Sequence, residues 1–197
     1  MTTRAHTLLP WTQSIPRLVS DQRIFKVTEV DAVDPRSGKS HVRVVLDCPD
    51  WVNVVAVTRD GRMVLIRQHR VGTNSVTLEI PGGMADPDEP IEATAARELE
   101  EETGFRAGRW VHLGTSEPNP AFQNNRLHSF LALECDRVND GHPDEGEDIE
   151  VVLMPPDEVL AAVKRGDITH ALVLTAFAFE FLRTDERVSF LSPRFGR

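Results

Sequence analysis

Three glutamates close together in the chain are the residues best suited to do chemistry. Glu98, Glu101 and Glu102 are spaced i, i+3 and i+4, so on a helix their carboxylates project from one face. Like charges at this spacing cost roughly 0.2–0.5 kcal/mol per pair. A divalent cation would offset that repulsion, and Mg²⁺ is held by a few carboxylates together with substrate phosphates. The pattern therefore predicts either a metal site or a solvated acidic helix face, which is the usual role of a charge run.

Residues 90–103 are predicted to form the helix that carries these glutamates. Pro90 suits a first helical turn, and Gly104 suits the position where a helix stops. A Gly-Gly turn at residues 82–83 ends a predicted strand, residues 76–80, so the unpaired N–H groups of the helix start face the site. The apolar residues that recur every fourth position and predict a buried stripe are Ile91, Ala95 and Leu99.

The residues around the glutamates follow a fixed spacing. It reads Gly83, five residues, Glu89, seven residues, Arg97-Glu98-Leu99, one residue, Glu101-Glu102, one residue, Gly104-Phe105. At every position this resembles the signature of the Nudix hydrolases, and about eight specified residue types at fixed offsets make a specific motif. The resemblance implies an α/β (α+β) fold, an α/β/α sandwich with a mixed sheet. It also implies Mg²⁺-dependent hydrolysis, with Mn²⁺ as the alternative ion, of a nucleoside diphosphate linked to another group.

Length and composition limit the domain organisation. With 197 residues, of which 40% are hydrophobic, the chain can bury one main core beside a small appendage. We expect an N-terminal β-sheet unit over residues 1–49, a Nudix domain over residues 50–190 and a tail over residues 191–197. No apolar run is long enough to cross a bilayer, no signal-peptide pattern is present, and two cysteines do not make a disulfide framework. A cytoplasmic location is expected.

The formal net charge of −9 argues against binding to nucleic acid or to an anionic membrane, since both need basic surface. The expected partner is a small molecule. If that molecule carries a diphosphate, metal ions and a few arginines must neutralise it locally, and the chain offers Arg67 and Arg70 for this purpose.

The remaining elements follow from periodicity and turn residues. In the N-terminal part, residues 25–33 and 41–46 are predicted strands joined by a hairpin loop, giving a two- or three-stranded sheet. Such a sheet is too small to be stable alone and should pack on the main domain or on a second subunit. The strands predicted for the main domain are residues 50–58, 63–70, 76–80, 110–115, 126–135 and 149–154. Two final helices are predicted, one ending at Gly166 and one over residues 170–182 with Thr169 as its cap.

Beyond the motif, the chain resembles the ADP-ribose pyrophosphatases. Pro120 falls about sixteen residues after the motif, a position associated with this subgroup, in a loop of turn residues and amides at residues 116–125. The resemblance implies that the loop selects the substrate, ADP-ribose or a related nucleoside diphosphate sugar, and that the protein is a homodimer sharing its N-terminal sheets. The loop continues Ala-Phe-Gln-Asn-Asn, which departs from the subgroup and leaves other nucleoside diphosphate sugars open. A plain connection is the alternative role for the loop.

The resemblance also implies roles for individual residues. The metal ligands would be Glu98, Glu101, Glu102 and the Gly82 carbonyl. Arg70 would meet the diphosphate, with Arg67 contributing, and Glu79 would be a further carboxylate near the metal. Arg97 more naturally braces the carboxylates, as an i, i+4 partner of Glu101, than touches substrate. Trp51 either stacks on a nucleobase or simply packs.

An acidic loop at residues 144–148 provides candidates for the catalytic base. Hydrolysis needs a group that orients or deprotonates the attacking water, and a carboxylate near the metal can serve. In the ADP-ribose pyrophosphatases a glutamate of this loop has that role. The Gly-Glu-hydrophobic match favours Glu147, with Glu145 second. A solvated turn is the alternative.

Two other functions are compatible with the sequence. One is a Nudix hydrolase of another nucleoside diphosphate derivative, such as a dinucleoside polyphosphate, NADH or an oxidised nucleotide. The other is a non-catalytic Nudix module that binds a nucleotide, although the complete set of carboxylates counts against it.

Overall fold

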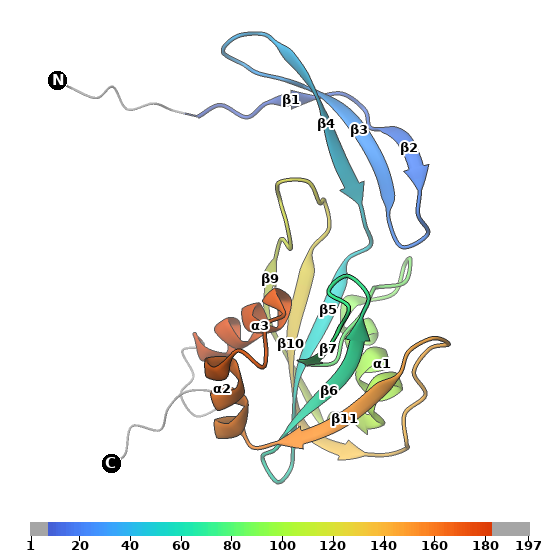
Figure 1. Cartoon of the computed structure of the whole chain (residues 1–197), viewed down its shortest axis with the longest axis vertical. Coiled ribbons are helices and arrows are strands. Elements are labelled where there is room, and N and C mark those ends of the chain that lie inside the picture. The colour runs from blue at the N-terminus through green and yellow to red at the C-terminus, as the bar shows by residue number, and fades with distance from the viewer. Residues whose placement is uncertain (1–7, 183–197) are drawn as a thin grey trace, which may run out of the picture. The chain divides into compact units, whose positions relative to one another are not determined.

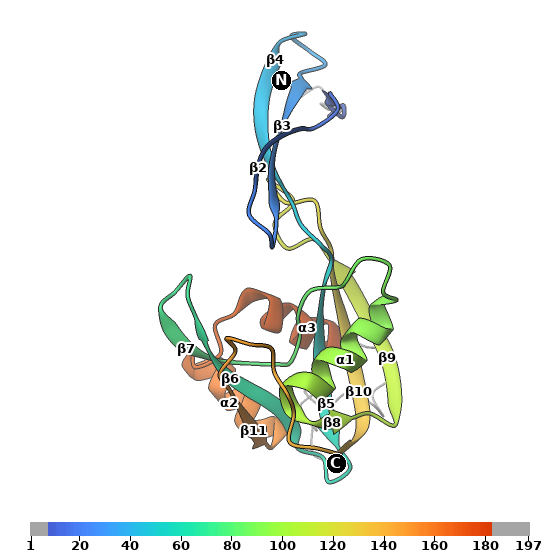
Figure 2. The ribbon, with the colours of Figure 1, turned by 90° about the vertical axis from the view of Figure 1, so that its right-hand side faces the viewer.

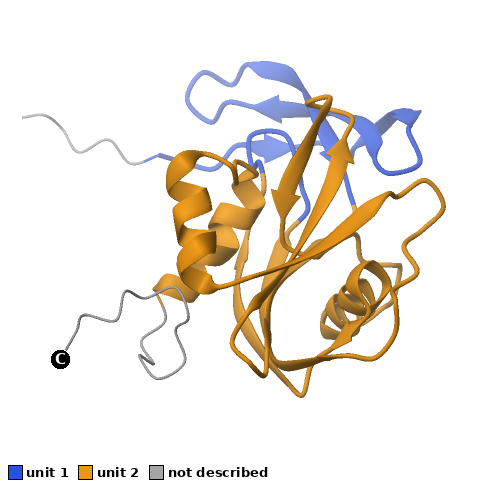
Figure 3. Cartoon of the chain, turned by 60° about the horizontal axis from the view of Figure 1, so that its bottom comes forward, with its two compact units in different colours: residues 1–48, 119–125 blue, residues 49–118, 126–197 orange. Residues whose placement is uncertain are grey.

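The computed structural model describes residues 8–182, and these form two compact units. The first unit combines the chain up to Cys48 with the segment Asn119–Asn125, and the second contains the remainder (Figure 3). The tail expected over residues 191–197, and the end of the domain expected over residues 50–190, lie outside the described residues.

The first unit is a four-stranded antiparallel sheet. Its strands are β1 (Thr12–Gln13), β2 (Arg17–Asp21), β3 (Lys26–Val33) and β4 (Ser40–Asp47), and β3 pairs with the other three. The β3–β4 hairpin was predicted, but the count of two or three strands was too low. The missed strands are a two-residue segment and a five-residue segment whose side chains are mostly exposed, so neither carries a burial pattern that sequence analysis can detect.

The segment Asn119–Asn125 is attached to this sheet by hydrogen bonds. The Leu46 N–H donates to the Phe122 carbonyl at 2.7 Å, and the Asn124 amide donates to Asp47 at 2.7 Å. The first unit is therefore assembled from two parts of the chain that are far apart in sequence.

The second unit is built on a seven-stranded mixed sheet. Its order is β11-β6-β5-β10-β8, with β7 also pairing with β6 and β9 with β10. The β5–β10 pair is parallel and the other pairs are antiparallel. The six strands predicted for this part of the chain are all present, whereas the two-residue β8 was missed. The bounds are β5 (Trp51–Thr58), β6 (Met63–Arg70), β7 (Ser75–Glu79), β8 (Phe105–Arg106), β9 (Arg109–Ser116), β10 (Leu127–Arg137) and β11 (Ile149–Met154).

Helices cover both faces of this sheet (Figures 1 and 2). Helix α1 (Ile91–Thr103) lies on one face, and α2 (Pro156–Arg165) and α3 (Ala171–Phe181) lie on the other. Alternation along β5 divides the core, because Val54 packs in the cluster with α1 while Val55 packs in the cluster with α2 and α3. The expected α/β/α sandwich is confirmed. No helix within residues 8–182 is long and apolar enough to span a bilayer.

The helix ends show where the predicted boundaries hold. Helix α1 begins one residue later than predicted, with Pro90 as its N-cap. It stops at Gly104 as predicted, where φ of 75° is left-handed and the N–H caps the Glu100 carbonyl. Helix α3 begins one residue later than predicted. His170 therefore takes the N-cap position, without a side-chain hydrogen bond, and the prediction that Thr169 caps this helix was wrong.

Candidate functional site

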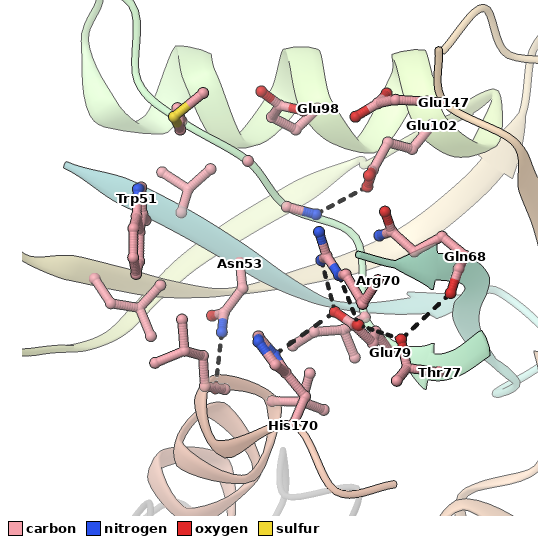
Figure 4. A pocket seen from close by; sticks show the side chains of 18 of the residues that line it. Trp51, Asn53, Gln68, Arg70, Thr77, Glu79, Glu98, Glu102, Glu147 and His170 are labelled. Carbon is pink, nitrogen blue, oxygen red and sulfur yellow. Dashed lines mark hydrogen bonds and ion pairs between the residues drawn. The ribbon is translucent and has the colours of Figure 1, made fainter. Parts of the chain in front are cut away.

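A cavity of about 840 Å³ lies within the second unit, where α1, the Gly82-Gly83 turn, the acidic loop and the start of α3 meet (Figure 4). This volume is typical of small-molecule sites. Eight of the residues predicted to take part in catalysis, substrate binding or metal binding line it: Trp51, Arg70, Glu79, Gly82, Glu98, Glu101, Glu102 and Glu147.

Three other candidates do not line the cavity. Arg67 lies on β6, where Gln68 and Arg70 line the cavity and Arg67 instead pairs with Glu150 of β11 at 3.1 Å. Glu145 is an exposed residue of the acidic loop, and Pro120 belongs to the first compact unit.

Two glutamates of α1 pack against the backbone of the glycine turn. The Gly82 N–H donates to Glu102 Oε2 at 2.9 Å. A Cβ at Gly83 would lie 2.5 Å from the Glu98 carboxyl carbon, and one at Gly82 would lie 2.3 Å from the Val52 carbonyl oxygen. Only glycine leaves room for these contacts, so the turn and the carboxylates form a single packed unit.

Arg97 holds the outer carboxylates together. Its Nη1 donates to Glu98 and to Glu101, both at 2.9 Å, which confirms the predicted i, i+4 pair. It also bonds Glu89 through Nε at 3.2 Å and Nη2 at 3.1 Å, and Nη2 donates to the Met84 carbonyl at 3.2 Å. The contact with Glu89 was not predicted, because the residue precedes α1 and has no helical spacing to the arginine. Arg97 in turn holds the pKa of the Glu89 carboxyl below its ordinary value.

The ionised forms of Glu98 and Glu102 are costly because the protein compensates their negative charge only in part. Burial raises the pKa of Glu98 to about 7 and that of Glu102 to about 8, and the charge of Glu147 adds to both shifts. Arg97 opposes the shift at Glu98, and the Gly82 N–H opposes it at Glu102. Glu102 is only 5% exposed. Ionising both groups therefore requires a further positive charge nearby.

The donor set fits a hard divalent cation. Carboxylate and carbonyl oxygens are the ligands that such ions prefer, and Glu98 and Glu102 both face the same glycine turn. Within residues 8–182, no three His, Cys, Asp or Glu side chains converge as a complete ligand set. A cation here would thus take one or two carboxylates and complete its coordination with backbone carbonyls, water and substrate phosphate, which is the mode that suits Mg²⁺.

Beyond the carboxylates, Arg70 and Glu79 form a two-pronged ion pair (Figure 4). Arg70 Nε donates to Glu79 Oε1 at 2.9 Å and Nη2 to Oε2 at 2.8 Å. The Thr77 hydroxyl also donates to Oε1, at 2.6 Å, and His170 Nδ1 lies 3.6 Å from Oε2. Burial acts to raise the pKa of Glu79, but the bonds from Arg70 and Thr77 outweigh it and the pKa is lowered. The pair is therefore ionised, and the orientation of Arg70 is fixed.

Several residues of the cavity were missed by sequence analysis. Gln68 is two residues from Arg70 on β6, and Asn53 is two residues from Trp51 on β5. Residues two apart on a strand share a face, so strand periodicity could have found both. Asp144 lies in the acidic loop that was singled out only for its glutamates. His170 had no local signal, because the fold brings the start of α3 to the cavity.

The comparisons with known proteins agree with this geometry. The profile of the NUDIX domain matches residues 49–177. The chain belongs to the Nudix family. The resemblance inferred from the spacing of residues 83–105 is thereby confirmed.

Its relatives within the family include nucleotide-sugar hydrolases. The chain is 31% identical over 175 residues to the ADP-ribose pyrophosphatase of Bacillus subtilis, covering 86% of this chain and 94% of that one. It is 35% identical over 137 residues to the GDP-mannose pyrophosphatase of Citrobacter koseri, covering 65% and 71%. A solved structure described as an ADP compounds hydrolase superposes with a TM-score of 0.77 at 26% identity, covering 89% and 94%.

The buried charge of Glu102 predicts a pH-dependent effect of Glu102→Gln on stability. The pKa of this carboxyl rises from 4.5 to about 8 on folding, so the folded state retains a proton that the unfolded state releases. The free energy of unfolding of the parent therefore falls as the pH rises through this window, and is constant above it. In EDTA the variant should be more stable by about 1–3 kcal/mol at pH 9, with the difference vanishing near pH 4.5.

Urea unfolding at several pH values measures this difference. Glu92→Gln, at an exposed position in the first turn of α1, is the matched control and should change stability little at any pH. Equal pH dependence of the parent and Glu102→Gln would show that burial of this carboxylate is not costly.

Proposed function

We propose that this protein is a divalent-cation-dependent pyrophosphohydrolase that cleaves ADP-ribose or a related nucleoside diphosphate sugar into a nucleoside monophosphate and a sugar phosphate. The observation that carries the proposal is the placement of the buried Glu102 and the half-buried Glu98 against the glycine turn in the same cavity as Arg70. The substrate class is supported by the relatives, which are named for ADP-ribose and GDP-mannose hydrolysis.

The proposed cation is Mg²⁺, with Mn²⁺ as the alternative. We propose Glu98, Glu102 and the Gly82 carbonyl as its ligands, with Glu101, the third carboxylate predicted from the sequence, beside them. A bound cation of this kind polarises phosphoryl oxygens and lowers the pKa of its water. Glu98 and Glu102 are the best-supported ligands because they are the more buried. The side chain of Glu98 is 14% exposed and that of Glu101 is 33% exposed, although Arg97 bonds both.

Arg70 is proposed to bind the diphosphate, with Glu79 fixing its orientation. A guanidinium can engage two phosphate oxygens at once. Glu79 uses Nε and Nη2 of Arg70, and Nη1 takes part in neither bond. Trp51 is proposed to contact the substrate from the cavity wall, whereas supporting roles for Arg67 and Pro120 rest on resemblance alone.

Glu147 is proposed to orient and deprotonate the attacking water. It lines the cavity, and its charge acts on both Glu98 and Glu102, which favours it over Glu145. Its Oε2 accepts a hydrogen bond from the Asp144 N–H at 3.2 Å, so the acidic loop itself presents this carboxylate.

The proposed activity is tested by incubating the purified protein and Mg²⁺ with ADP-ribose, GDP-mannose, a dinucleoside polyphosphate, NADH and an oxidised nucleotide. We expect the nucleotide sugars to be cleaved fastest, to a nucleoside monophosphate and a sugar phosphate identified by ³¹P NMR, and EDTA to abolish turnover. Faster turnover of another compound would change the substrate class. Binding of these compounds without turnover would favour a non-catalytic module.

Glu147→Gln should lower kcat by about 10²–10⁴-fold, the usual contribution of a general base, while the Kd for the substrate changes little. Steady-state kinetics and calorimetry give the two numbers. Glu145→Gln is the matched control in the same loop and should retain near-parental kcat. A full loss in the control with none in Glu147→Gln would reassign the base to Glu145.

We also propose that the protein is a homodimer joined through its N-terminal sheet. The first unit exposes several large apolar side chains, including Val42 and Val44 of β4, which are 54% and 50% exposed. Val42 and Val44 are two residues apart on β4 and so project from the same face of the sheet. Exposed apolar surface of this kind marks interaction sites. In analytical ultracentrifugation the parent should sediment as a dimer and the Val42→Glu/Val44→Glu variant as a monomer. Val71→Glu, at an 86% exposed position in the second unit, should leave the dimer intact, and a monomeric parent would contradict the proposal.

The proposed domain assignment remains a β-sheet unit over residues 1–49, a Nudix domain over residues 50–190 and a tail over residues 191–197. The profile match beginning at residue 49 supports the first boundary. A cytoplasmic location is also proposed. It is supported by Cys48 and Cys135, which are free thiols rather than a disulfide.

A further inference from the structure

The end of the cavity formed by the start of α3 has no role in the chemistry described above. Helix α3 has eleven residues, and its N-cap residue, His170, makes no side-chain capping bond. The next three residues, Ala171, Leu172 and Val173, line the cavity. The first N–H groups of a helix have no partner within the helix, so this wall presents backbone donors.

Two buried polar atoms beside these donors have no hydrogen-bond partner in the described part of the chain. They are Asn53 Oδ1 and His170 Nδ1. Asn53 is only 6% exposed, and its amide is fixed because Nδ2 donates to the Leu172 carbonyl at 2.9 Å. Figure 4 shows the Asn53 side chain directed from β5 toward the start of α3, beside the His170 ring. An acceptor left unpaired at a buried position is costly, and a ligand group that donates a hydrogen bond would remove this cost.

The local charge indicates which kind of group fits. Glu79 Oε2 lies 3.6 Å from His170 Nδ1, which is too long for a hydrogen bond but close enough for its charge to act. Because Arg70 already pairs with this carboxylate, the wall offers no uncompensated charge to a further ion. A neutral hydroxyl group is suitable because one oxygen can donate to Asn53 Oδ1 and accept from a backbone N–H.

The position next to Arg70 indicates which part of a substrate would arrive. Arg70 contacts Glu79, and Glu79 in turn approaches His170, so this wall lies one side chain away from the diphosphate-binding guanidinium. In a nucleoside diphosphate sugar, the rings bonded directly to the diphosphate are sugars, and the nucleobase is one ring further away.

We propose that Asn53, His170 and the first turn of α3 form a subsite for the hydroxyl groups of a sugar ring attached to the diphosphate, and that Asn53 Oδ1 accepts a hydrogen bond from one of these hydroxyls. The inference rests on the proposed function for the identity of the ligand. Two sugars of the substrate carry this chemistry, namely the ribose of the nucleoside and the distal sugar, and the test separates them.

The test is a thermodynamic cycle that combines one side-chain substitution in the protein with the removal of one hydroxyl group from the substrate. The parent and Asn53→Leu are each assayed with GDP-mannose, its analogue lacking one hydroxyl of the mannose, and its analogue lacking the 2′-hydroxyl of the ribose. Loss of one hydrogen bond to a buried acceptor should lower kcat/KM about tenfold. We expect Asn53→Leu to lose about tenfold with GDP-mannose but nothing further with the analogue that lacks the recognised hydroxyl. The analogue for which the parent and Asn53→Leu have the same kcat/KM identifies the sugar that Asn53 binds.

Independent losses for both analogues, or no loss in Asn53→Leu, would overturn the subsite. Asn139→Leu is the matched control, because Asn139 bonds Glu100 at 2.9 Å and does not line the cavity. It should affect all three compounds equally. If Asn53→Leu does not fold, His170→Ala replaces it in the same cycle. If the parent hydrolyses none of the compounds, the proposed function fails, and calorimetric Kd values for the same cycle with Mg²⁺ still test the subsite.

Discussion

The structure depends on the close packing of two carboxylates against a glycine turn. Glu102 accepts a bond from the Gly82 N–H, and Glu98 occupies the space that a side chain at position 83 would need. Burial makes the ionised forms of both costly, as their raised pKa values of about 7 and about 8 record. A solvated acidic helix face would not show this. The two carboxylates are therefore arranged so that they ionise fully only when a cation lies beside them.

The rest of the second unit fixes the positions of the glycine turn and of helix α1 relative to each other. Strand β7 leads directly into the turn, and α1 is fixed on the sheet by Ala95 and Leu99, both of which are fully buried. Residues of β5 alternate between the two faces of the sheet, so that Asn53 reaches α3 while its neighbours pack beneath α1. The cavity consequently draws on both layers of helices, with the proposed cation ligands from one and the proposed sugar subsite from the other.

Much of this arrangement could be predicted from the sequence, because local rules determine it. Pro90 and Gly104 bound α1, the glutamate spacing places the carboxylates on one face, and the continuous apolar run of β5 identifies a strand buried on both faces. The parts that could not be predicted depend on tertiary position. Nothing near His170 in the sequence shows that it approaches Glu79. Strand alternation puts Arg67 and Arg70 on opposite faces of β6, but it does not show which of these faces lines the cavity. The assignment of Thr169 as a cap failed because a shift of one residue at a helix start moves the N-cap to another side chain.

The segment Asn119–Asn125 gives the first unit a discontinuous sequence. Its residues lie between β9 and β10 of the second unit in chain order, yet they hydrogen-bond to the end of β4. A truncation at Cys48 would thus not excise a self-contained module. It would strip the Phe122 carbonyl and the Asn124 amide of their partners and leave an unsupported seven-residue protrusion on what remained. Shuffling or grafting of the two units in either direction would have to carry both pieces of the chain together.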